Sequence, residues 1–162
     1  MKACRTKPTR LHVFGLQIKY LATLTVGMVL EQMSRVNDVQ IKTYLVEDSP
    51  TIRDNLIATL EELTTVCAVG TAETEKESIM WLTNSINIWD LAIVDLFLKQ
   101  GTGIGVIAAC KNRSTHQTVI VLSNYTTPEV RTLCLSTGAD AVFDKSTEIE
   151  QLLEYCVKLG KK

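Results

Sequence analysis

Several chemically active side chains stand at the ends of short apolar runs in this 162-residue sequence. Glu47 and Asp48 follow one such run, and Asp95 lies near the end of another. Ser123 ends a third run, and Lys145 follows a fourth. If these runs are parallel strands of one sheet, their ends bring three carboxylates, a hydroxyl and an ammonium group to the same edge.

Such a group of side chains has a defined chemistry. Carboxylates a few ångströms apart repel one another, so they need a compensating cation. Oxygen ligands of this kind suit Mg²⁺, which keeps several waters and leaves room for phosphate oxygens. An aspartate beside the metal can attack a phosphoryl donor and form an aspartyl phosphate. Lysine and hydroxyl donors stabilise the charge that spreads over the transferred oxygens. The residue types therefore predict phosphoryl transfer to a carboxylate.

The elements that must position these residues are visible as an alternation along the chain. Near-continuous apolar runs rich in β-branched residues are typical of buried parallel strands; they are IKTYLV (41–46), VCAVG (66–70), LAIVDL (91–96), TVIVLS (118–123) and AVF (141–143). Segments between and after them have helical periodicity, in the sets Ile52, Leu56, Leu60, Leu63 and Ile149, Leu152, Leu153, Cys156. The alternation predicts an α/β fold, a doubly wound five-stranded parallel sheet with helices on both faces.

Proline and glycine mark where these helices begin and end. Pro50 suits the first turn of a helix, and Gly138 suits the end of one. The sequence GTGIG (101–105) resembles a glycine-rich phosphate cradle. It follows the third strand, however, and no Lys-Ser/Thr comes after it, so neither nucleotide fingerprint is met. We therefore expect a tight turn that enters a helix.

Length and charge restrict the function classes. A chain of this length holds one domain with a proper core. Residues 1–40 carry six Lys/Arg and two acidic residues, so the rest carries eleven against sixteen, a net charge of −5. This acidic body argues against direct nucleic-acid binding, which needs a basic surface. The five cysteines form no Cys-x-x-Cys pair. They read as small core residues in a reducing compartment, so we expect a cytoplasmic protein.

The first 39 residues have a different character. A basic start and the apolar run YLATLTVGMVL resemble a secretory signal, but no small-x-small cleavage site follows. Residues 11–30 are about long enough to cross a bilayer, yet Lys19 would be costly there. We interpret residues 1–39 as a leader that is either translated upstream of a true start near Met33 or a membrane-associated helix. The domain itself is expected to span residues 40–160, with no membrane role.

The signatures VEDSP, IVDL, the glycine at 103, VIVLS and GADAVFDKS together resemble the receiver domain of two-component response regulators. The resemblance covers residues 40–160 and implies a flavodoxin-like sheet with strand order 2-1-3-4-5. It also implies a role for each residue at the strand ends. Asp95 would be the phosphoacceptor, with Mg²⁺ held by Glu47, Asp48, Asp95 and the backbone carbonyl of Phe97. Ser123 would be the switch hydroxyl, and Lys145 would contact the phosphoryl group.

The same resemblance implies partners and output. A histidine kinase or a histidine phosphotransfer protein would supply the phosphoryl group, and a downstream protein would respond to it. Only LGKK follows the last predicted helix, so we expect a single-domain regulator that signals through the receiver surface. Receivers often pair through the fourth and fifth strand–helix units, which suggests a homodimer. We expect no enzymatic turnover beyond self-phosphorylation and slow autodephosphorylation.

Some positions depart from the family pattern. Receivers commonly have an aromatic residue three positions before the lysine, where its ring reports phosphorylation; here the position is Val142. Either Phe143 or Tyr125 could take over that coupling. A proline often follows the lysine, but this chain has Ser146. Two positions that tune dephosphorylation hold Phe97 and Tyr125, which predicts a long-lived phosphorylated state.

Other functions are compatible with the same residues. The pair Glu47 and Asp48 could cap the following helix in a solvated loop, and Lys145 could be a surface lysine. A phosphatase of the haloacid-dehalogenase type also uses an aspartate nucleophile, but it needs a second aspartate where this chain has Phe97. A pseudo-receiver would bind partners without being phosphorylated.

Overall fold

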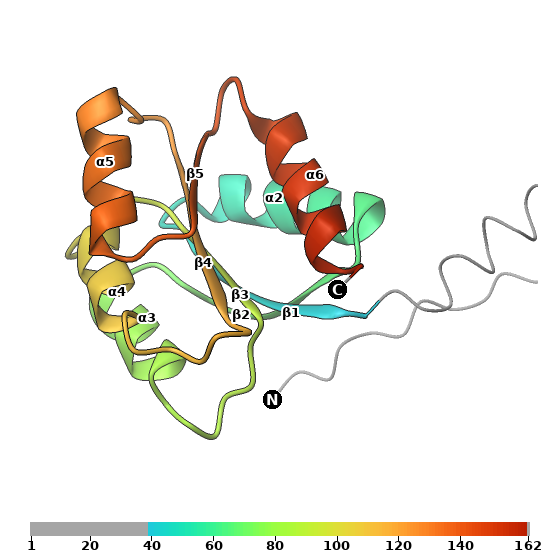
Figure 1. Ribbon diagram of the computed structural model, residues 1–162, viewed down its shortest axis with the longest axis horizontal. Helices are drawn as coiled ribbons and strands as arrows, with labels where there is room; N and C mark the ends of the chain where they lie inside the picture. Colours follow the sequence, from blue (N-terminus) through green and yellow to red (C-terminus); the bar gives the residue numbers. More distant parts are fainter. Residues whose placement is uncertain (1–38, 162) are drawn as a thin grey trace, which may run out of the picture.

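The computed structural model describes residues 39–161. It contains five parallel strands in one sheet, ordered β2-β1-β3-β4-β5. Helices α3, α4 and α5 cover one face, and α2 and α6 cover the other (Figure 1). The predicted flavodoxin-like α/β architecture is therefore confirmed. The expectations for the leader concern residues that, apart from Val39, lie outside this description.

The strands begin where the apolar runs begin, but three of them end at different residues. They are β1 (Ile41–Val46), β2 (Val66–Ala72), β3 (Leu91–Val94), β4 (Thr118–Ser123) and β5 (Ala141–Asp144). Strand β3 stops one residue before Asp95, although the apolar run continues to Leu96. The Asp95 amide still donates to the Val46 carbonyl at 2.9 Å, so the aspartate is held at the carboxyl end of the strand.

Four of the five helices in residues 39–161 have a side-chain N-cap. The helices are α2 (Pro50–Leu63), α3 (Glu75–Leu82), α4 (Gly103–Ala109), α5 (Pro128–Thr137) and α6 (Ile149–Leu159). Ser49 caps α2, with Pro50 at the first helical position as expected. Gly138 ends α5 with a φ of 127°, a conformation that favours glycine. No helix within residues 39–161 has the length and apolar composition needed to cross a membrane.

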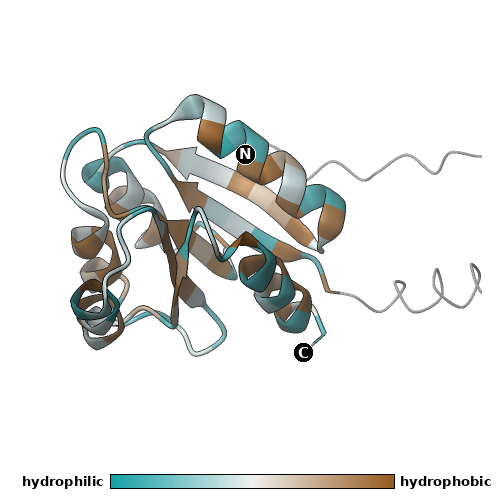
Figure 2. Ribbon diagram, turned by 90° about the horizontal axis from the view of Figure 1, so that it is seen from above, coloured by the Kyte–Doolittle hydropathy of each residue, from teal (hydrophilic) through white to brown (hydrophobic). Residues whose placement is uncertain are grey.

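Two hydrophobic cores lie on opposite sides of the sheet. One core contains Val94, Val121 and the fully buried Trp89, whose indole N–H donates to the Leu82 carbonyl at 3.0 Å. The other contains Leu60 and Leu152, from the two helices of the opposite face. Hydrophobic residues are concentrated in the strands and hydrophilic residues on the outer helix surfaces (Figure 2). This layering holds the sheet rigid, so its strand ends keep fixed relative positions.

The predicted apolar face of α2 is only partly buried. Leu60 is fully buried and Leu56 packs against the core, but Ile52 and Leu63 are exposed. Leu63 is the last residue of the helix, and Ile52 lies in its first turn. The two ends of the helix therefore extend past the core, and the periodicity alone did not reveal this.

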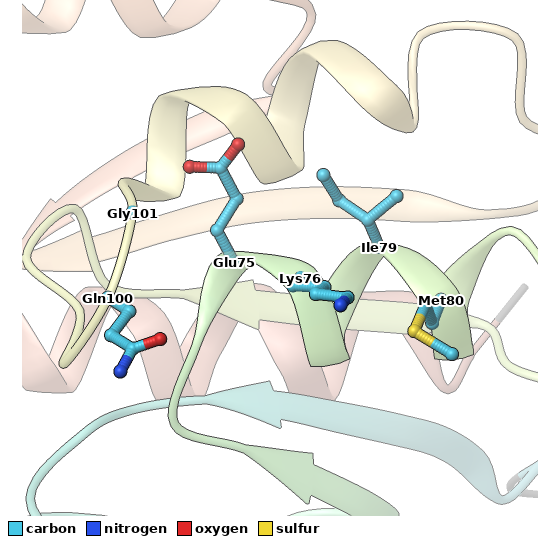
Figure 3. Close-up of a pocket in the computed structure, with 6 residues that line it drawn as sticks. All are labelled: Glu75, Lys76, Ile79, Met80, Gln100 and Gly101. Carbon is cyan, nitrogen blue, oxygen red and sulfur yellow. The ribbon is translucent and has the colours of Figure 1, made fainter.

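The glycine-rich turn after β3 binds a carboxylate of the same chain. Glu75 points toward the turn and the start of α4 (Figure 3), and its Oε2 accepts from the Thr102 amide at 2.7 Å. Gly101 has a φ of 82°, which suits the tight turn. The motif is thus a turn into a helix, as expected. A surface hollow beside it, lined by Glu75, Lys76, Ile79, Met80, Gln100 and Gly101, contains none of the predicted site residues.

Gly103 yields a prediction because it packs directly on the segment that carries Asp95. A Cβ at residue 103 would meet the Asp95 carbonyl oxygen at 2.1 Å, whereas a Cβ at Gly105 would meet only the end of the Glu75 side chain. Both glycines lie in the first turn of α4, where alanine gains about 1 kcal/mol of helix propensity. We expect Gly103→Ala to lower the free energy of unfolding by about 2 kcal/mol and Gly105→Ala to change it far less. Urea denaturation measures both; equal effects would contradict the close contact.

Candidate functional site

The first acidic residue of the site is fixed by the end of β1. The Glu47 amide donates to the Ala72 carbonyl of β2, which continues the sheet pairing by one residue. The Glu47 side chain is buried, and its Oε1 accepts from the Ser49 amide at 3.2 Å. Asp48 is the more exposed of the two acids. Because Ser49 caps α2, the acidic pair is not needed for that purpose.

Asp95 enters the same region from β3. Its side chain is buried, and its Oδ1 accepts a long hydrogen bond from the Phe97 amide at 3.4 Å. Carboxylate oxygens of Glu47, Asp48 and Asp95 lie within 4.8 Å of one another. The three acids, which are separated by up to 48 positions in the sequence, therefore form one cluster.

Lys145 provides the positive charge of this cluster. Its Nζ donates to Asp95 Oδ2 at 2.6 Å and to Glu47 Oε2 at 2.5 Å. Burial of the amine favours its neutral form, but the hydrogen bonds and charges of Asp95 and Glu47 outweigh this and raise the pKa of Lys145 above its ordinary value. The lysine is thus a cation held between two buried carboxylates, with a side chain only 9% exposed, and the alternative of a surface lysine is excluded.

Ser123 lies at the carboxyl end of β4, beside β5. Its carbonyl accepts from the Lys145 amide at 3.1 Å, so the two residues are joined through the backbone. The Ser123 Oγ is fully buried and has no hydrogen-bond partner among residues 39–161. A buried hydroxyl without a partner is unfavourable. A ligand oxygen that reached it would remove this cost.

The charges of the cluster do not balance. Three carboxylates and one ammonium group give a formal charge of −3 + 1 = −2. Two of the carboxylates are buried, which makes the repulsion between them stronger than it would be in water. The arrangement can attract a divalent cation and offers the Asp95 carboxylate as a nucleophile beside two donors, an ammonium and a hydroxyl.

Aromatic side chains lie beside the acids. Phe97 and Tyr125 are both exposed, and their rings meet edge to face with centroids 6.1 Å apart. Val142 is buried on the α3–α4–α5 side of the sheet, whereas Phe143 packs on the opposite side against Tyr155. The idea that Phe143 takes over the aromatic role of position 142 is therefore wrong, because a neighbour in a strand points to the opposite face.

A polar network beside the cluster was missed by sequence reasoning. Arg131 of α5 donates to Glu148 Oε2 at 2.6 Å and to the Val142 carbonyl at 2.8 Å. The Thr126 hydroxyl donates to Asp144 Oδ2 at 2.9 Å. The Arg131 guanidinium and the Asp144 amide, both donating to Glu148, lower the pKa of that carboxyl. An aspartate two residues before Ser146 is a sequence signal for a side-chain-stabilised turn, but nothing near Arg131 in the sequence indicates its partners.

The fold and the strand-end cluster define a flavodoxin-like α/β protein with an acidic site at the carboxyl edge of its sheet, and comparison with known proteins agrees with this class. The sequence matches the response regulator receiver domain over residues 43–156. The chain therefore belongs to the receiver-domain family of two-component systems. No curated protein sequence matches it.

Solved structures of low sequence identity share the fold. The receiver domain of the putative response regulator NarL from Mycobacterium tuberculosis is 19% identical with a TM-score of 0.66, over 75% of this chain and 97% of that one. The receiver domain of Francisella response regulator 1452 is 21% identical with a TM-score of 0.65, over 75% and 97%. A LuxR-family DNA-binding response regulator from Staphylococcus aureus is 17% identical with a TM-score of 0.65, over 74% and 98%.

The position of Lys145 leads to a prediction about stability. Lys145→Met leaves two buried carboxylates side by side without their cation, which is expected to cost about 3 kcal/mol of unfolding free energy. Lys99→Met removes the ion pair of an exposed lysine with Glu73 and is expected to cost less than about 1 kcal/mol. Urea denaturation at neutral pH compares the two variants. A cost for Lys145→Met no larger than that for Lys99→Met would show that the buried pairs do not hold the site together.

Proposed function

We propose that this receiver accepts a phosphoryl group on Asp95, in the presence of Mg²⁺, from a histidine kinase or a histidine phosphotransfer protein. The observation that carries the proposal is the contact of Lys145 Nζ with both Glu47 and Asp95. It supports a site in which one carboxylate is the nucleophile and the ammonium group contacts the incoming phosphoryl oxygens. The Ser123 hydroxyl, which has no hydrogen-bond partner in the described part of the chain, supports a second phosphoryl contact.

The donor set fits a hard divalent ion. Glu47, Asp48 and Asp95 offer carboxylate oxygens within a few ångströms, and the excess negative charge favours a cation. We propose that these three residues and the backbone carbonyl of Phe97 hold Mg²⁺. Bound there, the ion would neutralise the charge of the carboxylates and of the phosphoryl oxygens. This role fits the acids better than a helix cap or a solvated loop.

The chain's own residues then carry out a simple displacement. A carboxylate oxygen of Asp95 attacks the phosphorus of the phosphohistidine. The P–O bond to Asp95 forms as the P–N bond breaks, and the imidazole nitrogen leaves with the bonding electron pair. Lys145 and Ser123 stabilise the charge on the transferred oxygens. The product is an acyl phosphate, and the only further chemistry proposed is its slow hydrolysis.

A groove beside Lys145 supports the location of the donor protein. It runs between α2 and the β5–α6 turn and is lined by Ile52, Asn55, Leu56, Thr59, Leu122, Asn124, Lys145 and Ile149. The exposed part of Ile52 gives it an apolar side, and Lys145 connects it to the acids. We propose that the donor docks here with its histidine directed at Asp95.

The output surface is proposed on the neighbouring strand–helix units. Helix α5 packs beside the edge strand β5 and carries Leu133 and Leu135, each about half exposed, on either flank of the buried Cys134. Either leucine offers apolar contact area to a protein that docks at this edge of the sheet. We propose that this face binds a downstream protein target or pairs two copies of the chain as a homodimer.

Phosphorylation gives the direct test. Incubation with acetyl phosphate and Mg²⁺ is expected to add one phosphoryl group, detected as a mass increase that Asp95→Asn abolishes. Chelation of the metal and the Asp48→Asn substitution are both expected to slow labelling, roughly tenfold or more, because each weakens metal binding. Labelling of Asp95→Asn at the wild-type rate would overturn the assignment of the acceptor. An unchanged labelling rate after chelation of the metal would overturn the metal site.

The rings of Phe97 and Tyr125 lead to a prediction about lifetime. We expect a long-lived phosphorylated state because these side chains hinder an in-line water and supply no general base. Phe97→Asn opens this path and adds a group that can orient water, so we expect hydrolysis roughly tenfold faster. Ile88→Asn is the matched control: Phe97 and Ile88 are 63% and 61% exposed, and Ile88 precedes the amino end of β3. Loss of the acyl phosphate is followed by mass spectrometry after removal of the donor. A wild-type lifetime of seconds would contradict the prediction.

A further inference from the structure

Arg131 connects two loops that both carry site residues. Its guanidinium donates to the Thr126 carbonyl at 3.1 Å and, more weakly, to the Thr126 hydroxyl at 3.3 Å. On its other side it reaches the Val142 carbonyl in β5 and the Glu148 carboxylate. Thr126 lies three residues after Ser123 in the β4–α5 loop. One side chain therefore links the loop after β4 to the strand that leads to Lys145.

The turn around Lys145 is held by the same network. Asp144 Oδ1 accepts from the amides of Ser146 and Thr147 at 2.8 and 3.1 Å, which closes the turn directly after the lysine. The Asp144 amide donates to Glu148 Oε2 at 2.7 Å, the oxygen that also accepts from Arg131. Receivers often have a proline after the lysine, where this chain has Ser146. The Asp144 carboxylate holds the turn here in place of that proline.

The connection is continuous from one site residue to the other. Thr126 contacts Asp144 directly and Arg131 on its other side, and Asp144 is the residue before Lys145. Val142 is a small buried side chain, and its carbonyl oxygen accepts a hydrogen bond from Arg131. Movement of the β4–α5 loop must either break these polar contacts or carry the Lys145 turn with it.

We propose that Arg131 is a positioning residue. Through Thr126, Asp144 and Glu148, it couples the β4–α5 loop, which follows Ser123, to the β5–α6 turn, which contains Lys145. The inference rests on the proposed function, because its trigger is a phosphoryl group that draws the Ser123 hydroxyl toward it. The hydrogen bonds of Arg131 would then transmit the change that, in other receivers, an aromatic ring three residues before the lysine transmits. None of these hydrogen bonds of Arg131 involves Glu47, Asp48 or Asp95.

The chain contains a matched control at the opposite end of the same two strands. Arg113 donates to the carbonyls of Cys110, Gln117 and Gly138 and to Asp140 Oδ2, all at 2.7 to 3.0 Å. Gln117 and Asp140 directly precede β4 and β5. Arg113→Met therefore removes a comparable number of hydrogen bonds without touching the coupling path.

The test is an amide NMR titration of the whole chain with beryllofluoride, a phosphoryl mimic, and Mg²⁺. In the wild type we expect shift changes at residues 95–97, 123–127 and 141–148. In Arg131→Met the changes at 95–97 should persist, while those at 141–148 should shrink by roughly half or more. Arg113→Met should respond as the wild type does. Thr126→Val, compared with Thr132→Val, tests the same path with a substitution of equal size, because the Thr132 hydroxyl donates to the Pro128 carbonyl within α5 and is not part of the Arg131 network.

The outcomes separate the two proposals. If the wild type shows no change at residues 95–97, the proposed function fails and this inference fails with it. If the wild type responds and both Arg131→Met and Thr126→Val transmit the full change to residues 141–148, the coupling role alone is overturned. If Arg113→Met loses the response as strongly as Arg131→Met, the effect is general destabilisation and the coupling role is likewise overturned.

Discussion

The site depends on one cation held between two buried carboxylates. Lys145 lies nearly one hundred positions from Glu47 and fifty from Asp95, yet its ammonium group touches both. Without it, two buried acids would face each other in a medium that screens charge poorly. The same contact keeps the two acids close, because each is attracted to the lysine more strongly than it is repelled by its neighbour.

The sheet is the means by which distant residues reach this contact. Parallel pairing places the ends of β1, β3, β4 and β5 at one edge, and the backbone hydrogen bonds continue one residue past the strands at Glu47, Asp95 and Lys145. The two cores then prevent the strands from sliding against one another. The acids thus extend from a rigid support, and their mutual distances do not depend on flexible loops.

The alternation of strands and helices, the helix layers and the meeting of the acidic residues at one edge followed from local signals in the sequence, whereas the strand order was implied by the resemblance to receiver domains. Near-continuous apolar runs identify buried parallel strands, and polar residues after them identify the chemical edge. The contacts of Arg131 did not follow, since they join residues up to seventeen positions apart through side-chain geometry alone. The exposure of Ile52 did not follow either, because periodicity gives the face of a helix but not how far it extends past the core. Phe143 was considered for an aromatic role without regard to the alternation of strand faces, which excludes it.

The glycine-rich turn at residues 101–105 is occupied by a carboxylate of the same chain. Its amide-lined surface is the kind that attracts anions, but a glutamate from α3 already meets that demand. A free anion would have to displace the Glu75 carboxylate. Because Glu75 is tethered to the chain, its effective concentration at the turn is far higher than that of an anion in solution. Because Glu75 belongs to the same chain, the occupancy of this turn by a carboxylate does not depend on the concentration of any anion in solution.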